Sequence, residues 1–267
     1  MPGLDGTEHC RIERQGGVVI VEMNRPEAKN ALSPAMLVGM ADAWEAIDAD
    51  DGVRCAVLTG AGGDFSTGMD LKAFGGSEPN PYQERFVADP DLHWKALLRH
   101  YHLRKPLIAA VEGWAVAGGT EILQATDVRI AGRHARFGVF EARRGLFPLG
   151  GSTVRLARQI PYTMAMELLL TGREMWAEEA QSVGLITHVV DDGHALARAI
   201  QIAELISRNG PLAVEAIKQS VQAASGLPED EALKQELEIG TPIFATEDAK
   251  EGARAFAEHR EPKFQRR

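Results

Sequence analysis

The chain is poor in cysteine, has no long apolar run and carries no surplus of positive charge. Its 267 residues include only Cys10 and Cys55, which argues against a disulfide framework and fits a reducing compartment. No apolar stretch reaches the roughly 18 residues that a membrane-spanning helix needs. The first ten residues, MPGLDGTEHC, are polar and acidic, unlike a secretory signal peptide. We therefore expect a cytoplasmic protein with no membrane partner.

The charge balance excludes one class of partner. The chain has 38 acidic and 29 basic residues and a formal net charge of −9. Because no basic stripe offsets the acid, we expect no nucleic-acid partner. A few local cations can still bind an anionic ligand. His100 and His102 lie two positions apart, but no H-E-x-x-H pattern or cysteine cluster accompanies them, so we also expect no metal site.

The first fifty residues read as two strands and a helix. The runs CRIERQ (10–15) and VVIVEMN (18–24) are strand-like, and the two glycines between them mark a turn. Ser33 is a favourable N-cap and Pro34 suits the first position of a helix. Apolar residues then recur at helical spacing from Leu37 onward.

The rest of the chain changes from strands to helices. Further strands are predicted at 53–60, 105–113 and 127–132, and a helix near 91–103 follows a polar segment. This alternation predicts an α/β architecture. Helices dominate from about residue 151, and after about 205 the pattern is helical, with breaks at prolines 211, 228 and 242. We expect a core domain at 1–204 and a helical region at 205–267.

Two short loops carry small residues between a strand and a probable helix. They are FSTGMDL (65–71) and VAGGTEI (116–122). Both can present backbone N–H groups to an anion, and two such loops meeting in space would form an oxyanion hole. The alternative is that their glycines only let a helix pack closely on a sheet. The order of residues does not show whether the loops meet.

Two glutamates are candidate catalytic groups. Glu121 lies in the first turn of its predicted helix, where the helix dipole favours a carboxylate, so it could be a structural charge. Glu141 precedes Arg143 and Arg144 and could be a salt-bridged surface residue. Together, two carboxylates can act as acid and base on one water if only one of them holds a proton.

Six segments in order resemble the crotonase superfamily, most closely the enoyl-CoA hydratases. They are NRPEAKNALS (24–33), FSTGMDLKAF (65–74), GWAVAGGTEILQATD (113–127), FGVFEARRGLFPLGGS (137–152), TGREMWAEEAQSVGLITHVV (171–190) and EGARAFAEHREPKF (251–264). The resemblance spans about residues 8 to 264. It implies a spiral core of repeated ββα turns with a C-terminal helical assembly region.

The resemblance also implies an activity and a set of site residues. The activity is hydration of trans-2-enoyl-CoA, in fatty-acid or related acyl degradation, without a cofactor other than the coenzyme A of the substrate. The backbone N–H groups of Met69 and Gly118 would form the oxyanion hole. Glu121 would be the main base and Glu141 the main acid. Coenzyme A would run past Lys29, Ala31, Gly68, Asp70, Leu71 and Lys72. The two lysines could instead be plain surface charges.

Departures from the family pattern concern the acyl group. Met69 and Ala117 replace the usual alanine and glycine, and Phe140 and Phe147 are bulky. With the segment 74–100, these residues suggest a long, branched or ring-bearing acyl group, such as a steroid side chain.

Three alternatives remain open: a crotonase-type isomerase, a CoA-thioester hydrolase and a non-catalytic acyl-CoA-binding subunit. The resemblance implies a homotrimer or a dimer of trimers. An apolar stripe of Ala253, Phe256 and Ala257 in the tail is consistent with such assembly.

Overall fold

The fold is built around two sheets in a computed structural model that describes residues 4–70 and 80–267. The main sheet has the strand order β1-β2-β3-β4-β6-β9. β1 pairs antiparallel with β2, and each later neighbour is parallel. These strands are β1 (Cys10–Gln15), β2 (Val18–Met23), β3 (Cys55–Gly60), β4 (Leu107–Val111), β6 (Val128–Gly132) and β9 (His188–Val190). The second sheet contains β5 (Trp114–Val116), β7 (Arg136–Gly138) and β8 (Met175–Trp176).

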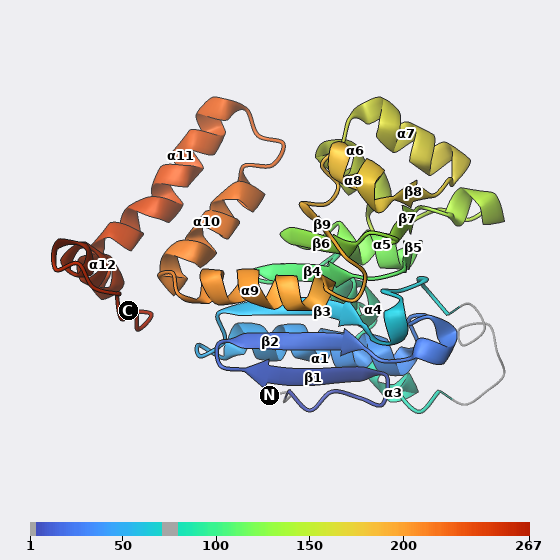
Figure 1. The fold of residues 1–267 in the computed structure, drawn as a ribbon, viewed down its shortest axis with the longest axis horizontal. Coiled ribbons are helices and arrows are strands. Elements are labelled where there is room, and N and C mark those ends of the chain that lie inside the picture. Colours follow the sequence, from blue (N-terminus) through green and yellow to red (C-terminus); the bar gives the residue numbers. More distant parts are fainter. Residues whose placement is uncertain (1–3, 71–79) are drawn as a thin grey trace.

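Helices cover both faces of the main sheet (Figure 1). Side chains alternate along each strand, so β2 places Val19 and Val21 in the larger core cluster with α1 (Pro34–Ala49). Val18 and Ile20 point to the other face. There, α9 (Ala195–Ser207) packs through alanines at positions 195, 199 and 203, whose small size allows a close approach.

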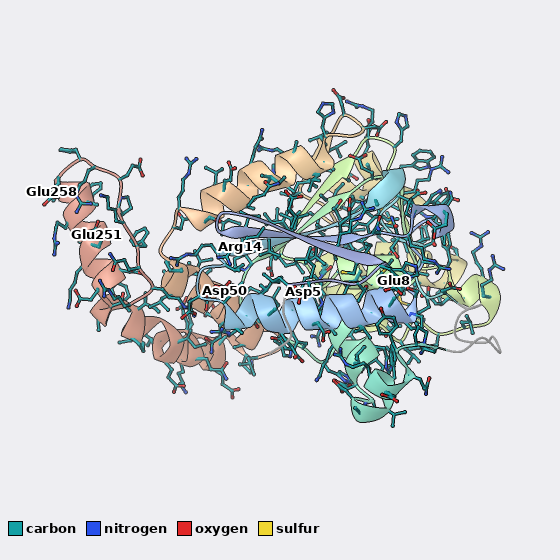
Figure 2. All side chains as sticks on the ribbon, turned by 90° about the horizontal axis from the view of Figure 1, so that it is seen from below. Asp5, Glu8, Arg14, Asp50, Glu251 and Glu258 are labelled. Atoms are coloured by element: carbon teal, nitrogen blue, oxygen red, sulfur yellow. The ribbon has the colours of Figure 1, made fainter. Side chains whose placement is uncertain are left out.

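The predicted start of the first helix is confirmed. α1 begins at Pro34, and the Ser33 hydroxyl accepts a hydrogen bond from the Met36 amide at 3.2 Å. At the other end of α1, Arg14 Nη1 donates to Asp50 Oδ2 at 2.6 Å. Figure 2 shows these two side chains where β1 and α1 end.

The helix predicted near 91–103 is wrong beyond its first half. α4 covers only Leu92–Ala96. Leu98 adopts a left-handed conformation with φ 53°, and the Arg99 amide then donates to the Trp94 carbonyl at 2.8 Å. This is a Schellman-type helix end built on leucine instead of the usual glycine, a choice that composition does not signal.

The remaining helices are α3 (Gln83–Ala88), α5 (Gly118–Leu123), α6 (Ser152–Gln159), α7 (Tyr162–Thr171), α8 (Ala177–Ser182), α10 (Pro211–Ala223), α11 (Glu229–Gly240) and α12 (Glu247–Ala257), with 3-10 turns η1 (Pro26–Ala28), η2 (Ala61–Gly63), η3 (Glu141–Arg144) and η4 (Thr241–Ala245). Helices dominate after residue 151, as predicted, whereas α3 lies in the polar segment for which a loop was predicted. The short strands β5, β7, β8 and β9 were not predicted, because strands of two or three residues carry too little periodicity.

The C-terminal helices project away from the sheets (Figure 1). In Figure 2, Glu251 and Glu258 mark α12 at the far end of the molecule. Arg266 ties this end back to α10, since its Nη2 donates to Glu215 Oε2 at 3.0 Å. The division at residue 204 falls within α9, which packs on the main sheet, and it stays a prediction. No helix in the described ranges is both long and apolar enough to cross a bilayer.

Candidate active site

The two small-residue loops meet beside β5. The Ser66 amide donates to the Trp114 carbonyl at 2.8 Å, and the Val116 amide donates to the Ser66 carbonyl at 3.0 Å. A Cβ on Gly68 would lie 2.6 Å from the Gly118 nitrogen, and a Cβ on Gly119 would lie 2.3 Å from the Ser66 oxygen. Such contacts are too short for any side chain, so this convergence requires glycine.

The convergence leaves two amides side by side. A Cβ on Gly118 would lie 3.5 Å from the Met69 nitrogen. Within residues 4–70 and 80–267, neither amide donates a hydrogen bond. Gly118 is the first residue of α5, where an N–H group has no acceptor inside the helix. Ala117 holds the turn before it at φ 50° and ψ −127°, a backbone region that suits glycine better. The pair can therefore donate to one oxygen.

Glu121 is held in place by the start of a second helix. Glu121 is 5% exposed. The amide of Ser152, the first residue of α6, donates to Glu121 Oε1 at 3.2 Å. Burial raises the pKa of Glu121. Backbone hydrogen bonds from residues 150 to 152 and the charge of Arg155 oppose that rise. These groups limit the rise without cancelling it, so the pKa of Glu121 stays above that of an ordinary glutamate.

Glu141 has the opposite surroundings. It begins η3, and its Oε2 is buried without a hydrogen-bond partner in the part of the chain that the structure describes. Burial, followed by the nearby charge of Glu121, raises the pKa of Glu141 to about 7. Glu141 makes no ion pair within residues 4–70 and 80–267, and Arg143 instead stacks over Phe140 with its Cζ 5.1 Å from the ring centroid. The surface-salt-bridge interpretation of Glu141 is therefore not supported.

Both glutamates line one cavity of about 740 Å³. Met69 and Gly118 line it as well. Most of the remaining wall is aromatic or aliphatic: His93, Trp94, Leu97, Trp114, Val116, Phe140, Leu146, Phe147 and Leu149. A mostly apolar pocket with a few converging polar groups is the usual form of a small-molecule site. Among the described residues, no group of three or more His, Cys, Asp or Glu side chains is arranged to hold a metal ion.

Only some of the residues expected to contact coenzyme A lie at the cavity. Lys29 lines the cavity, with its Nζ 5.6 Å from the Trp114 ring centroid and 3.7 Å from Asp64 Oδ2. Gly68 lies where the two loops meet. Asp70 forms an ion pair with Arg25. Ala31 is half-buried and, like Asp70, lies outside the cavity lining. Leu71 and Lys72 lie outside the described residues.

Sequence analysis missed two parts of the site. Trp114 forms part of the cavity wall, stacked against Arg136 with the guanidinium carbon 4.8 Å from its ring centroid. The amides at 150–152 hold Glu121. A usable signal existed, because G-G-S at 150–152 is a small-residue helix start like the one at 117–119. Phe140, Phe147 and part of the segment 74–100 were expected to lie at the pocket. They do, since Phe140, Phe147, His93, Trp94 and Leu97 line the cavity.

Comparisons with known proteins agree with this geometry. The family model described as enoyl-CoA hydratase/isomerase matches residues 13–267. Enoyl-CoA hydratase EchA19 of Mycobacterium tuberculosis is 54% identical over 267 residues, which is 100% of both chains. The (E)-benzylidenesuccinyl-CoA hydratase of Thauera aromatica is 37% identical, over 95% of this chain and 97% of its own. The crystal structure of enoyl-CoA hydratase EchA1 from Mycobacterium marinum has a TM-score of 0.89 at 43% identity, covering 97% of this chain and 99% of that one.

The chain belongs to the enoyl-CoA hydratase/isomerase family. This confirms the resemblance to the crotonase superfamily. The predicted α/β fold, with a crotonase-type core and a helical C-terminal region, is confirmed too.

Proposed function

We propose that this chain hydrates trans-2-enoyl-CoA to 3-hydroxyacyl-CoA, with Glu121 and Glu141 acting on one water. The observation that carries the proposal is the contrast between the two carboxylates on one cavity. Backbone N–H donors oppose the rise in pKa that burial causes at Glu121. Burial and the charge of Glu121 raise the pKa of Glu141 to about 7, and its Oε2 has no hydrogen-bond partner among the described residues. At neutral pH the site therefore offers a base and an acid together, which water addition requires.

The reaction follows from these positions. The thioester oxygen accepts hydrogen bonds from the Met69 and Gly118 amides, which withdraws electrons from C3. Water adds to C3 while Glu121 takes one of its protons, and the negative charge passes to the thioester oxygen. Protonated Glu141 then delivers its proton to C2, so one C–O and one C–H bond form. An amide donor of this kind contributes about 3–4 kcal/mol in the transition state.

Enoyl-CoA hydratase activity is supported by the names of the relatives. EchA19 of M. tuberculosis is a full-length match, and the short-chain-enoyl-CoA hydratase of Clostridium acetobutylicum is 38% identical over 93% of this chain. The prediction of an enzyme is thereby confirmed. Isomerase and hydrolase chemistry use the same amide pair but need no second carboxylate to deliver a proton to C2. A non-catalytic subunit would need neither glutamate.

The coenzyme A moiety would leave the cavity beside Lys29. This side chain lies at the cavity wall and is 54% exposed, so its ammonium group can meet a phosphate. Gly68 and Asp70 flank Met69 in the loop that supplies its amide. No metal or redox cofactor takes part in this scheme.

The acyl group would be bulky. The cavity has room for more than a four-carbon chain, and aromatic side chains form much of its wall. Two relatives act on acyl groups larger than crotonyl, namely the (E)-benzylidenesuccinyl-CoA hydratase and the 2,3-dehydroadipyl-CoA hydratase of Escherichia coli. A ring-bearing acyl group, including a steroid side chain, fits this lining.

The C-terminal helices would mediate assembly into a homotrimer or a dimer of trimers. They expose large apolar side chains in the single chain, among them Val221 (70%), Leu237 (67%), Phe244 (85%) and Phe256 (84%). Burial of such side chains against another copy is favourable. A cytoplasmic location is in keeping with two buried, free cysteines.

Ultraviolet absorbance of enoyl-CoA solutions tests the proposal. We expect the conjugated thioester band of crotonyl-CoA and longer or ring-bearing enoyl-CoAs to decay on addition of the protein. The rate should be unchanged by a chelator. Release of free thiol would instead indicate a hydrolase. Activity confined to moving the double bond of a 3-enoyl-CoA would indicate an isomerase. No turnover of any member of the panel would overturn the proposal.

A further inference from the structure

Two arginines just outside the cavity lining join the two segments that supply its α4 side and its Leu146–Leu149 side. Arg99, which follows α4, donates from Nε to the Leu149 carbonyl at 2.8 Å. Arg155, on α6, donates from Nη2 to the Leu98 carbonyl. We call these two side chains and the two carbonyls the arginine clasp. It joins the end of α4 to the loop that precedes α6.

The backbone of the clasp is built for this contact. Leu98 is 4% exposed and has φ 53°, a conformation that residues other than glycine rarely adopt. That conformation ends α4 and presents the Leu98 carbonyl to Arg155. Such strain persists where its surroundings hold it, which often marks a functional position.

The Arg99 guanidinium is fixed from other sides as well. Its Cζ lies 5.0 Å from the ring centroid of Trp94, and Nη1 donates to His100 Nε2. His100 is in turn held by Asp91, whose Oδ1 lies 2.5 Å from Nδ1. Trp94 itself lines the cavity. One guanidinium therefore touches one cavity wall and bonds to the backbone of the other.

The two joined walls surround the space where an acyl chain would lie. His93, Trp94 and Leu97 stand on the α4 side, and Leu149 stands on the loop. The loop side chains Leu146, Phe147 and Leu149 are 50%, 63% and 56% exposed, so apolar packing secures them weakly. The clasp is thus a main restraint on the separation of the walls.

We propose that Arg99 is a positioning residue that sets the width of the acyl cavity, and with it the preferred size of the acyl group. The inference rests on the proposed function. Without the Arg99–Leu149 hydrogen bond, the loop is free to move outward. A small acyl group then loses wall contacts, whereas a bulky one gains room.

Arg99→Met tests this directly, because methionine keeps an apolar stem and removes the donor. We expect the ratio of kcat/KM for trans-2-decenoyl-CoA to that for crotonyl-CoA to rise about tenfold, the low end of what one methylene contact is worth. The change should come from the KM for crotonyl-CoA, with kcat kept within about threefold, because the amides that hold Glu121 remain. Arg99→Gln, whose amide can reach the same carbonyl, should restore part of the original ratio.

Arg158→Met is the matched control, since Arg158 is exposed on the same helix as Arg155 and its side chain makes no hydrogen bond within the described ranges. It should leave the ratio unchanged. Arg155→Met breaks the other half of the clasp and removes a positive charge that lowers the pKa of Glu121. The acidic limb of its pH–rate profile should therefore move to higher pH, which structural loosening alone would not cause.

An unchanged ratio in Arg99→Met, at a wild-type Tm, would overturn the proposal. If that variant does not fold, an unchanged ratio in folded Arg99→Leu, which also lacks the donor, has the same meaning. If the wild-type protein hydrates no enoyl-CoA, the proposed function fails. The clasp is then tested by calorimetric binding of butyryl-CoA and decanoyl-CoA, where Arg99→Met should favour the longer ligand and equal effects on both would contradict the inference.

Discussion

Glu121 and Glu141 line the same cavity, but their carboxyl groups have different hydrogen-bonding surroundings. Glu121 is 5% exposed and receives backbone N–H groups from the start of α6. Glu141 begins a short 3-10 turn and keeps one buried oxygen without a partner in the described structure. Glu121 thus has hydrogen-bond donors from the protein itself, whereas Glu141 Oε2 has none among the described residues. Burial raises the pKa of both glutamates, and several N–H donors oppose that rise at Glu121, whereas Glu141 lacks a comparable set.

This difference in hydrogen-bond donors also explains how two carboxyl groups can lie near each other in one cavity. Like charges at close range oppose each other's ionisation, so one of the two tends to keep a proton. Here the N–H donors decide which one. The charge of Glu121 contributes to the raised pKa of Glu141, so the proposed base would help to keep the proposed acid protonated.

The largest expected effect comes from removing either carboxylate. Glu121→Gln and Glu141→Gln should each lower kcat by about 10²–10⁴, the usual worth of general acid or base catalysis. Affinity for a saturated acyl-CoA should change little, because the two amides remain. The double variant should lose less than the sum of the two free-energy effects, since both groups serve one water. Steady-state hydration and calorimetry measure these quantities.

Glu178→Gln, on the exposed surface of α8, is the control and should be neutral. Hydration by Glu141→Gln at the wild-type rate would show that the comparison is wrong and that Glu141 is a surface charge. Joint loss of binding and folding in both variants would make the residues structural.

A second change disturbs only the position of Glu121. A Cβ on Gly150 would lie 2.5 Å from Glu121 Oε2, so Gly150→Ala must displace the carboxylate. A misplacement of about 1 Å can cost on the order of 10² in rate, and we expect a loss of that size in kcat. Gly240→Ala is matched to it, because a Cβ there meets nothing within 4 Å. Equal rates for the two alanine variants would contradict the role of the 150–152 amides.

The pH dependence sharpens the comparison. Glu141 must carry a proton to act as the acid, and its pKa is raised to about 7. The rate should therefore fall as pH rises above about 7, approaching tenfold per pH unit. At low pH the rate should fall again as Glu121 gains a proton. A profile of kcat/KM measures both limbs. A rate that stays flat from pH 6 to 9 would remove Glu141 as the acid.

The smallest expected effect is on stability. The pKa of Glu141 is near 7 in the folded chain against 4.5 for an ordinary glutamate, so the folded state binds more protons between these values. Unfolding free energy therefore decreases as pH rises from 4.5 to 7, and glutamine avoids this loss. Allowing for partial exposure, Glu141→Gln should raise Tm by about 2 °C at pH 8 and leave it unchanged at pH 4. Calorimetry at both values is the check, and a lower Tm at pH 8 would contradict it.

Local rules predicted the elements that form the site. Ser33 and Pro34 placed a helix start, and the glycines at 118 and 119 indicated a close backbone approach. Both follow from the properties of single residues and their neighbours. The Leu98 helix end did not follow, because leucine in a left-handed conformation is favoured only by contacts with distant residues such as Arg155.

The relation between the two loops was beyond local rules. Residues 66–69 and 114–119 are joined by hydrogen bonds across about fifty positions, and only the completed sheet brings them together. The Glu141 oxygen that has no hydrogen-bond partner in the described structure is likewise a result of packing. Resemblance to a family supplied what the local pattern could not, by indicating that both segments serve one site.

The Met69 and Gly118 donors belong to the main chain, so no ordinary side-chain substitution deletes them. A point mutation can replace the side chain of Glu121, of Glu141 or of a wall residue, but it leaves the backbone amides in place. In the proposed mechanism, a lineage that keeps the close contacts of Gly68 and Gly119 can exchange a carboxylate or reshape a wall and still activate a thioester. In this proposal the main chain activates the thioester, whereas the side chains at the two glutamate positions determine which reaction follows. The first is hard to lose by mutation, and one substitution can change the second. For an engineer, Glu141 and Phe147 are the places to begin redesign, and Gly68, Gly118 and Gly119 are the places to leave alone.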